Sequence, residues 1–260
     1  MGLLKRILGQ RGYEKFTRKL AQTANTYVKV HRLSAWASED LRTVTILNNY
    51  ELNKVLDVGA NVGQFADSLF DYGYDGEVVS FEPTSQAYAT VSAKAQKNKN
   101  WHVADKCAIG DSDGEIEINI SDNTAFNSIK EIKEQYASYN SQSAISNKEN
   151  VAIFRLDSLR GKYFNERDNL FLKIDTQGFE KEVLQGAEES LKIVKGVKIE
   201  VPLVSVYEGV EWHMVDFINF FDEKGFKCIS TAEVSVDRRT GVVYEVDMIF
   251  LKENLLSESA

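Results

Sequence analysis

The chain of 260 residues contains only two cysteines, Cys107 and Cys228, and only two prolines, Pro83 and Pro202. The cysteines lie far apart in apolar, strand-like surroundings, which argues against a disulfide framework or a cysteine-based metal site and indicates a reducing compartment. No apolar run reaches the ~18 residues that a membrane-spanning helix needs. A signal peptide is not evident, because charged and polar residues follow closely on Met1. We therefore expect a cytoplasmic protein without a transmembrane segment.

Outside the N-terminal segment, acidic residues outnumber basic ones. Residues 1–32 carry eight Lys and Arg against one acid, whereas the whole chain has a net charge of −8. The remaining residues, 33–260, therefore carry a net charge of about −15. Because contacts to phosphate need basic surface, this acidic body argues against a nucleic-acid substrate.

The basic N-terminal segment has apolar residues at helical spacing, beginning with Leu3, Leu4, Ile7 and Leu8. Residues 1–50 are interpreted as a helical cap, packed on the rest of the chain or on a second subunit of a homo-oligomer. The alternative is a surface helix attracted to anionic lipid, which would give a peripheral membrane contact, or to a glycan-assembly partner.

The most informative segment is a short apolar strand, 54–58, that runs into a glycine turn and then a helical pattern. Glycines in such a turn let the backbone approach a nucleotide-like cofactor closely. A carboxylate at Asp57 would repel a pyrophosphate but would favour a cofactor with a cationic amino-acid moiety. S-adenosylmethionine is such a cofactor. The candidate binding residues from this segment are Asp57, Gly59, Asn61, Gly63 and Phe65.

A second strand, 77–82, ends in Glu82, 23 residues after Gly59. An acid in this place binds ribose hydroxyls in nucleotide-binding folds. NAD would need the same acid, but the turn lacks the Gly-x-Gly-x-x-Gly pattern and contains Asp57. The two acids together favour S-adenosylmethionine.

Helical and strand-like stretches alternate along the chain, which predicts an α/β fold with a mostly parallel, doubly wound sheet in three α/β/α layers. Expected helices are 39–50, 64–72, 84–98, 179–190 and 211–224. Expected strands are 54–58, 77–82, 101–109, 171–175 and 197–201, followed by an antiparallel hairpin of 227–233 and 243–251. A further hairpin, 115–120 with 151–156, is inserted after the third strand, and the polar stretch 121–150 is interpreted as a lid or substrate loop.

Several short motifs occur in a fixed order. They are Leu56-Asp57-Val58-Gly59-Ala60-Asn61-Val62-Gly63, Phe81-Glu82-Pro83, Ala108-Ile109-Gly110, Asn127-Ser128, Leu156-Asp157, Lys173-Ile174-Asp175-Thr176-Gln177-Gly178-Phe179-Glu180, Val183-Leu184-Gln185-Gly186-Ala187, Tyr207-Glu208-Gly209 and Glu245-Val246-Asp247-Met248-Ile249-Phe250. Over roughly residues 52–252 the chain resembles the FkbM-type methyltransferases. The resemblance implies a Rossmann-like class I methyltransferase domain, for which we expect bounds of 51–254 and a C-terminal tail of 255–260. It also implies S-adenosylmethionine-dependent O-methylation of sugars, glycans or similar polyhydroxylated metabolites, with S-adenosylhomocysteine as the product.

An acceptor hydroxyl must lose its proton as oxygen attacks the methyl carbon. Asp175, at the end of the fourth main strand, is the first candidate for the general base, although it could instead cap the following helix. Glu180 either steadies an acceptor hydroxyl or complements the helix dipole. His213 suits proton transfer by its ordinary pKa, but a lone histidine is more often packed or solvent-facing.

Other residues are assigned by their position after the strands. Ala108 follows the third strand, where the adenine is expected, while Asn127 and Ser128 reach the cofactor or the acceptor from the inserted hairpin. The Tyr207, Glu208 and Trp212 side chains are expected to contact the acceptor. A carboxylate pair of Asp175 and Glu200 would be able to bind Mg²⁺, yet no third ligand is evident, and no metal is predicted.

Two other functions compete with this one. A nucleic-acid methyltransferase would share Asp57 and Glu82, but it should carry an Asn/Asp-Pro-Pro-aromatic motif where this chain has Asp175-Thr176-Gln177-Gly178. Other small-molecule acceptors remain open. A cofactor-binding scaffold without activity is the second competing function, which the presence of Asp57, Glu82 and Asp175 disfavours.

Overall fold

The computed structural model describes residues 38–121, 124, 127–133, 145–237 and 239–257. The predicted N-terminal helices before residue 38 therefore lie outside the described residues. The chain divides into two compact units: one joins the N-terminal part up to Glu51 with Gln64–Asp75, and the other joins Leu52–Gly63 with Gly76–Ala260. None of the described helices combines the length and apolar character needed to cross a bilayer.

The described part of the smaller unit is built from two helices, α3 (Glu39–Asn49) and α4 (Gln64–Asp71). Ser38 caps α3 by accepting a hydrogen bond from the backbone N–H of Leu41 at 3.3 Å. Apolar residues at helical spacing bury one side of each helix, including Leu47 in α3 and Leu69 in α4. Both helices confirm the sequence-based prediction to within one residue.

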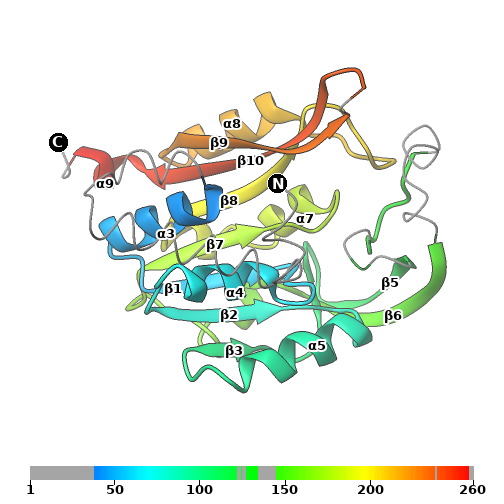
Figure 1. Ribbon diagram of the computed structural model, residues 1–260, viewed down its shortest axis with the longest axis horizontal. Helices are drawn as coiled ribbons and strands as arrows, with labels where there is room; N and C mark the ends of the chain where they lie inside the picture. Colours follow the sequence, from blue (N-terminus) through cyan, green and yellow to red (C-terminus); the bar gives the residue numbers. More distant parts are fainter. Residues whose placement is uncertain (1–37, 122–123, 125–126, 134–144, 238, 258–260) are drawn as a thin grey trace, which may run out of the picture. The chain divides into compact units, whose positions relative to one another are not determined.

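The larger unit contains a seven-stranded sheet in the order β3-β2-β1-β7-β8-β10-β9 (Figure 1). Its strands are β1 (Lys54–Val58), β2 (Glu77–Phe81), β3 (Trp101–Val103), β7 (Leu170–Ile174), β8 (Val194–Pro202), β9 (Phe226–Asp237) and β10 (Val242–Lys252). Strands β3, β2, β1, β7 and β8 run parallel to one another, and β10 runs antiparallel to both β8 and β9. The predicted α/β fold with a closing antiparallel hairpin is confirmed.

The central strands are almost continuous apolar runs because they are buried on both faces, as is usual in parallel sheets. Every residue of β7 is buried, and so are four of the five residues of β1. Lys173 is the one charged residue in the β7 run and Asp57 the one acid in β1. These two exceptions place opposite charges side by side in the middle of the apolar sheet.

The remaining helices of the larger unit are α5 (Ser85–Ala95), α7 (Glu180–Gln185), α8 (Met214–Glu223) and α9 (Glu253–Ser257), with 3-10 turns at Leu156–Leu159 and Ser190–Lys192. Of these helices, α5, α7 and α8 are shorter than the sequence predicted, and α9 was not predicted. The predicted helix 179–190 ends early, with Gly186 as its C-cap, and Gly186 packs so closely against β4 (Ala108–Gly110) that a Cβ there would lie 1.7 Å from the Gly110 carbonyl oxygen.

The predicted third strand, 101–109, is wrong as a single element. It divides into β3 and β4, since the charged Asp105 and Lys106 between them form ion pairs with Lys162 and Glu149 instead of entering the sheet. β4 joins the inserted hairpin, β5 (Gly114–Ser121) and β6 (Ile145–Arg155), in a separate three-stranded sheet of order β4-β6-β5. The predicted lid range 121–150 is thus too wide, because 145–150 belong to β6.

Candidate functional site

A row of polar side chains crosses the centre of the parallel sheet. Ser80 in β2, Asp57 in β1 and Lys173 in β7 are in-register neighbours. The Ser80 hydroxyl donates to Asp57 Oδ2 at 3.0 Å, and Lys173 Nζ lies 3.1 Å from Asp57 Oδ1. From β3, Trp101 Nε1 donates to the Ser80 hydroxyl at 3.0 Å. The row lies just below the carboxyl edge of the sheet, where open α/β folds bind their ligands.

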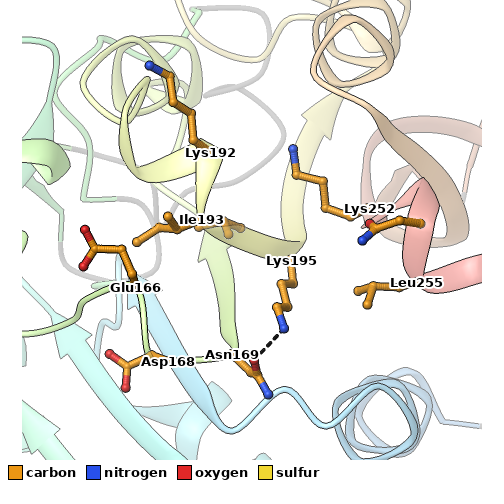
Figure 2. A pocket seen from close by; sticks show the side chains of 10 residues that line it. Glu166, Asp168, Asn169, Lys192, Ile193, Lys195, Lys252 and Leu255 are labelled. Atoms are coloured by element: carbon orange, nitrogen blue, oxygen red, sulfur yellow. Dashed lines mark hydrogen bonds between the residues drawn. The ribbon is translucent and has the colours of Figure 1, made fainter.

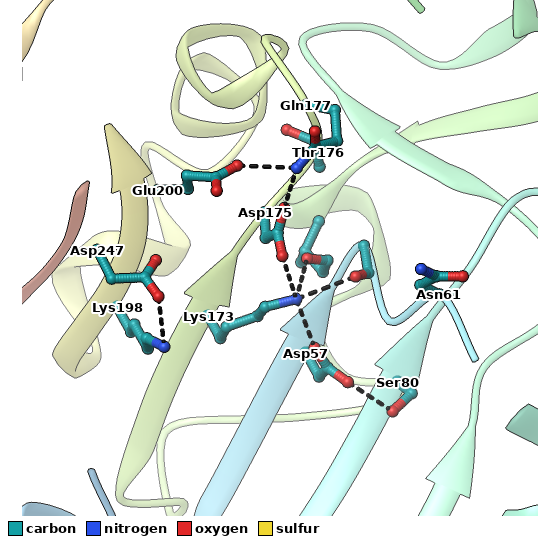
Figure 3. A network of polar contacts seen from close by, with 12 residues as sticks. Asp57, Asn61, Ser80, Lys173, Asp175, Thr176, Gln177, Lys198, Glu200 and Asp247 are labelled. Atoms are coloured by element: carbon teal, nitrogen blue, oxygen red, sulfur yellow. Dashed lines mark hydrogen bonds and ion pairs between the residues drawn. The ribbon is translucent and has the colours of Figure 1, made fainter. Parts of the chain in front are cut away.

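Lys173 connects the β1 turn with the end of β7. Its Nζ donates to the Gly59 carbonyl at 3.0 Å and lies 3.5 Å from Asp175 Oδ2 (Figure 3). Burial disfavours the charged form, but Asp57 and Asp175 outweigh burial and raise the pKa of Lys173 above its usual value. Lys173 is therefore a fixed cation between two carboxylates.

Asp57 is completely buried, with no part of its side chain exposed, and Lys173 compensates its charge. The prediction that Asp57 favours a cationic cofactor did not include Lys173, which pairs with the carboxylate. Direct contact of Asp57 with a cationic cofactor stays a prediction, but the electrostatic environment of the turn is that of an ion pair.

The turn after β1 is shaped by left-handed backbone. Gly59, Asn61 and Gly63 have φ values of 77°, 48° and 80°. The Gly59 and Ala60 N–H groups donate to the Phe81 carbonyl at 3.1 and 3.0 Å, which ties the turn to β2. A Cβ at Gly59 would lie 1.8 Å from the Asp175 carbonyl oxygen. Glycine is thus required at 59 because the ends of β1 and β7 meet there.

Glu82, which follows β2, is held by the same turn. Its carboxylate accepts hydrogen bonds from the Asn61 N–H at 2.8 Å and from the Thr84 N–H and hydroxyl at 2.9 and 2.5 Å. Asn127 reaches this cluster from the insertion, since its Nδ2 lies 3.5 Å from Thr84 Oγ1. Burial raises the pKa of Glu82, although these donors oppose the shift. The structure therefore brings together Asn61, Glu82 and Asn127, three of the predicted cofactor residues.

One observation in particular indicates that this cluster is suited to bind an adenosyl group. The Asn61 Oδ1 atom is buried and has no hydrogen-bond partner among the described residues. A buried acceptor without a donor is costly, and native structures rarely leave one unmatched. A hydroxyl or amino group of a bound nucleoside would supply that donor.

Asp175 lies at the carboxyl edge, directly after β7. Its side chain is 34% exposed, whereas its neighbour Lys173 is 7% exposed. Burial favours the protonated form, but the Lys173 ammonium and the Gln177 amide outweigh it and hold the pKa of Asp175 below its usual value. Asp175 is thus an ionised carboxylate at neutral pH with access to the space above the sheet.

Gln177 connects Asp175 to a second carboxylate (Figure 3). Its Nε2 donates to Asp175 Oδ1 and to Glu200 Oε2, both at 2.8 Å, while its Oε1 accepts the Tyr207 hydroxyl at 2.5 Å. Gln177 adopts a left-handed backbone with φ of 55°, which is uncommon for a residue other than glycine. Such strain persists where the surroundings enforce it, often at functional sites. The predicted neighbourhood of Asp175 and Glu200 is present, with the amide between them.

Glu180 is turned toward the backbone. Its carboxylate accepts from the Thr176 N–H at 2.9 Å, the Thr176 hydroxyl at 3.1 Å and the Gly178 N–H at 3.1 Å. Burial raises the pKa of this carboxyl, although the same donors oppose the shift. Of its two predicted roles, the geometry favours the structural one, in which Glu180 holds the 175–178 loop.

The predicted acceptor residues lie along the segment after β8. Tyr207 is buried and pairs with Ile132 of the insertion, and the exposed Glu208 donates its N–H to the Glu131 carbonyl at 2.8 Å. Trp212 packs edge-on against Phe217 with 5.3 Å between ring centres. Of the three, Tyr207 is the one joined to the carboxylate network by a hydrogen bond of the described structure.

His213 precedes α8 and belongs to its cap. Its Nε2 lies 2.9 Å from the Ser205 hydroxyl, and its backbone N–H donates to Asp216 Oδ2 at 2.9 Å. These contacts do not bring His213 to Asp175. For the remaining predicted cofactor residues the structure shows local contacts: Ala108 is buried in β4, the Ser128 backbone pairs with Asn119, and Phe65 is buried within α4 of the smaller unit.

The sequence did not identify Lys173 and Gln177, which contact Asp175, or Glu245, whose pKa is raised in part by the charge of Asp175. A signal existed for Lys173, because it interrupts the apolar run Leu170-Phe171-Leu172 just before Ile174. Gln177 carried no comparable signal, since its role depends on backbone geometry. Glu245 alternates with apolar residues in β10 and reads from the sequence as a surface position.

No group of three or more His, Cys, Asp or Glu side chains within the described ranges is arranged to hold a metal ion. A cavity of about 500 Å³ lies at the opposite edge of the sheet, near the amino ends of β7 and β8 (Figure 2). Charged residues line it, among them Asp168, Lys195 and Lys252. None of the predicted site residues is part of this cavity.

Comparison with known proteins identifies a protein family that matches this chain. A family model described as "Methyltransferase FkbM domain" matches residues 57–228, which is more than half of the chain. No match was found among curated proteins. Among solved structures, magnesium protoporphyrin IX methyltransferase from Synechocystis PCC 6803 with bound S-adenosylmethionine has 11% identity and a TM-score of 0.47, covering 96% of this chain and 95% of its own. The methyltransferase domain of bacterial CtHen1-C has 9% identity and a TM-score of 0.46, covering 84% and 98%.

Proposed function

Because the chain belongs to the FkbM methyltransferase family, we propose that it methylates a hydroxyl group of a sugar, a glycan or a similar polyhydroxylated acceptor. The protein is an S-adenosylmethionine-dependent methyltransferase. When bound, this cofactor supplies an electrophilic methyl group on a sulfonium. The contribution of the chain is to bind the donor, to orient the acceptor and to receive the hydroxyl proton.

Donor binding is proposed for the cluster around Glu82. Glu82 and Asn61 are joined through the turn, and the Asn61 Oδ1 atom has no donor among the described residues. These groups suit the hydroxyls of a ribose and the polar edge of a nucleoside. Asn127, which lies beside Thr84, would contact the same ligand.

One observation carries the proposed chemistry: Asp175 is an ionised carboxylate with a partly exposed side chain at the carboxyl edge of the sheet. An acceptor hydroxyl that hydrogen-bonds to Asp175 would transfer its proton to this carboxylate as the carbon–oxygen bond forms and the carbon–sulfur bond breaks. General base assistance of this kind contributes about 10²–10⁴-fold to a rate. Lys173 and Gln177 are proposed to fix the position of the base.

The test is transfer of a labelled methyl group from S-adenosylmethionine to a panel of sugars, sugar nucleotides and glycan fragments. Asp175→Asn should preserve donor binding, measured by calorimetry, and should lower kcat about 10²–10⁴-fold. The control is Glu188→Gln, which makes the same carboxyl-to-amide change on an exposed residue. Normal turnover by Asp175→Asn, or a product methylated on nitrogen or carbon, would show that the proposal is wrong.

A cytoplasmic location is part of the proposal. Cys107 is a buried free thiol and Cys228 an exposed free thiol. Burial raises the pKa of Cys107 to about 12, so that this thiol is unreactive at neutral pH. Free thiols fit a reducing compartment.

A further inference from the structure

The acceptor side of the carboxyl edge carries more acids than bases. Asp175 ends β7, Glu200 lies in β8, and Glu245 and Asp247 lie in β10. In the antiparallel register, Glu245 lies opposite Pro202 and Asp247 opposite Glu200. Because side chains alternate along strands, Glu200, Glu245 and Asp247 point to the same face. Three carboxylates on two neighbouring strands thus stand beside the proposed base.

Two lysines only partly balance these acids. Lys198, two residues before Glu200, lies 2.8 Å from Asp247 Oδ2. The Lys173 ammonium is placed between Asp57 and Asp175. Glu200 receives a hydrogen bond from the neutral amide of Gln177. With these contacts made, the carboxylates of Glu200 and Glu245 have no ion-pair partner among the described residues.

Glu245 is the clearest case. Its residue is 9% exposed, and within the described part of the chain its carboxylate makes no hydrogen bond or ion pair, while its oxygens keep some contact with solvent. The charged groups that act on it are Glu180, Asp175 and Asp247, all of them acids. A buried carboxylate without a partner is costly unless a ligand or a proton compensates it.

In the absence of a ligand, bound protons compensate the buried carboxylates. Burial, reinforced by Glu180, Asp175 and Asp247, raises the pKa of Glu245 to about 8. Burial together with the neighbouring acids Asp175, Glu245 and Asp247 raises the pKa of Glu200 well above its usual value. Burial and the charges of Glu245, Glu200, Glu180 and Asp175 raise the pKa of the nearby Tyr207 hydroxyl well above its usual value, so that it stays neutral. The site therefore retains protons that a bound cation could displace.

We propose that the acceptor carries a protonated amine close to the methylated hydroxyl, as in an amino sugar, and that Glu245 and Glu200 bind this ammonium. The inference rests on the proposed function and adds a substrate class to it. An ammonium would give Glu245 a charge-assisted hydrogen bond, which is the strong kind. A phosphate or carboxylate on the acceptor would be repelled from the same place.

The methyl donor is also cationic, but the sheet order separates it from Glu245. The proposed donor groups Glu82 and Asn61 follow β2 and β1, whereas Glu245 lies in β10, three strands from β1 with β7 and β8 between them. Asp175 stands between the two regions, at the end of β7. The unpartnered carboxylate therefore faces the acceptor side of the base.

The first experiment measures binding without turnover. Glucosamine, galactosamine and mannosamine are titrated by calorimetry at pH 7 into the protein saturated with S-adenosylhomocysteine, in two buffers of different ionisation enthalpy. The N-acetyl forms serve as matched ligands, because they keep the hydroxyls and lose the charge. We expect at least one amine to bind about 10–100-fold more tightly than its N-acetyl form and to release protons.

Two variants locate the effect. Glu245→Gln should abolish the preference for the amine and the proton release, with unchanged binding of S-adenosylmethionine. Glu233→Gln, the same change at an exposed position of β9, should leave both intact. Equal or tighter binding of the N-acetyl or anionic sugars would overturn the inference, and so would a loss of donor binding in Glu245→Gln.

Labelled methyl transfer separates this inference from the proposed function. Transfer to hydroxyls of neutral sugars with no preference for amines would leave O-methylation standing and would exclude the ammonium site. Amine binding that depends on Glu245, without methyl transfer to any hydroxyl, would support the ammonium site and would contradict the proposed O-methylation.

Discussion

The ammonium of Lys173 lies 3.1 Å from the carboxylate of Asp57, and both side chains are buried in the middle of the parallel sheet. The pair joins β1 to β7 directly beneath the turn and the proposed base. Its contribution to stability depends on both partners being present, because either charge alone would be buried without compensation.

Removing one partner should therefore be much more harmful than removing both. Lys173→Met should lower the free energy of unfolding by about 3–5 kcal/mol, as found when a buried pair loses one member. The double variant Asp57→Asn with Lys173→Met should recover a large part of that loss. Urea unfolding at pH 7 measures both, and equal destabilisation of the single and double variants would contradict the coupling.

Gly59 offers a sharp geometric prediction. A Cβ there would lie 1.8 Å from the Asp175 carbonyl oxygen, on a backbone with φ of 77°. Gly59→Ala should therefore displace the turn and weaken donor binding at least about tenfold, since the turn also positions the N–H that binds Glu82. Gly114→Ala is the control, because a Cβ at Gly114 has no neighbour within 4 Å. Calorimetry with S-adenosylmethionine gives the comparison, and similar affinities would contradict the packing argument.

Gln177 is expected to act as a positioning residue for Asp175. Gln177→Ala removes the hydrogen bonds at 2.8 Å to both Asp175 and Glu200, so kcat should fall about 10–100-fold while the donor Kd changes little. Tyr207→Phe removes only the hydroxyl that orients the amide and should cost about tenfold or less. The pH profile of kcat tests the mechanism: in Gln177→Ala its acidic limb should move upward, since the pKa of Asp175 loses a stabilising donor. An unchanged profile with lowered stability would indicate a purely structural role.

Glu245 predicts how stability depends on pH. Its pKa is raised from 4.5 to about 8 in the folded chain, so between these values the folded state holds a proton that the unfolded state has released. Stability should therefore fall as the pH rises from about 5 to 8, with a slope of at most about 1.4 kcal/mol per pH unit from this one group. Glu245→Gln should flatten the slope, and Glu200, whose pKa is also raised, should account for a remaining part. Urea unfolding at several pH values measures the slope, and a wild-type stability that rises over this range would contradict the assignment.

Although β4 and α9 were not predicted as separate elements, the sequence alone predicted the order of the main-sheet strands, the identity of the central ones and the position of Asp57, Glu82 and Asp175 at strand ends. It could do so because apolar runs and their period report burial directly, and because parallel strands bring their carboxyl ends to one edge. The same logic placed Asp175 near Glu200 before any geometry was known.

Only the tertiary structure decided which charges meet. That Lys173 neutralises Asp57 and that β4 leaves the main sheet both depend on neighbours distant in the chain. The same is true of Gln177, whose left-handed backbone aims one amide at two carboxylates, and of Glu245, which is buried without a partner among the described residues. Pairing and burial are properties of contacts across strands, and a residue's position in the sequence does not determine them.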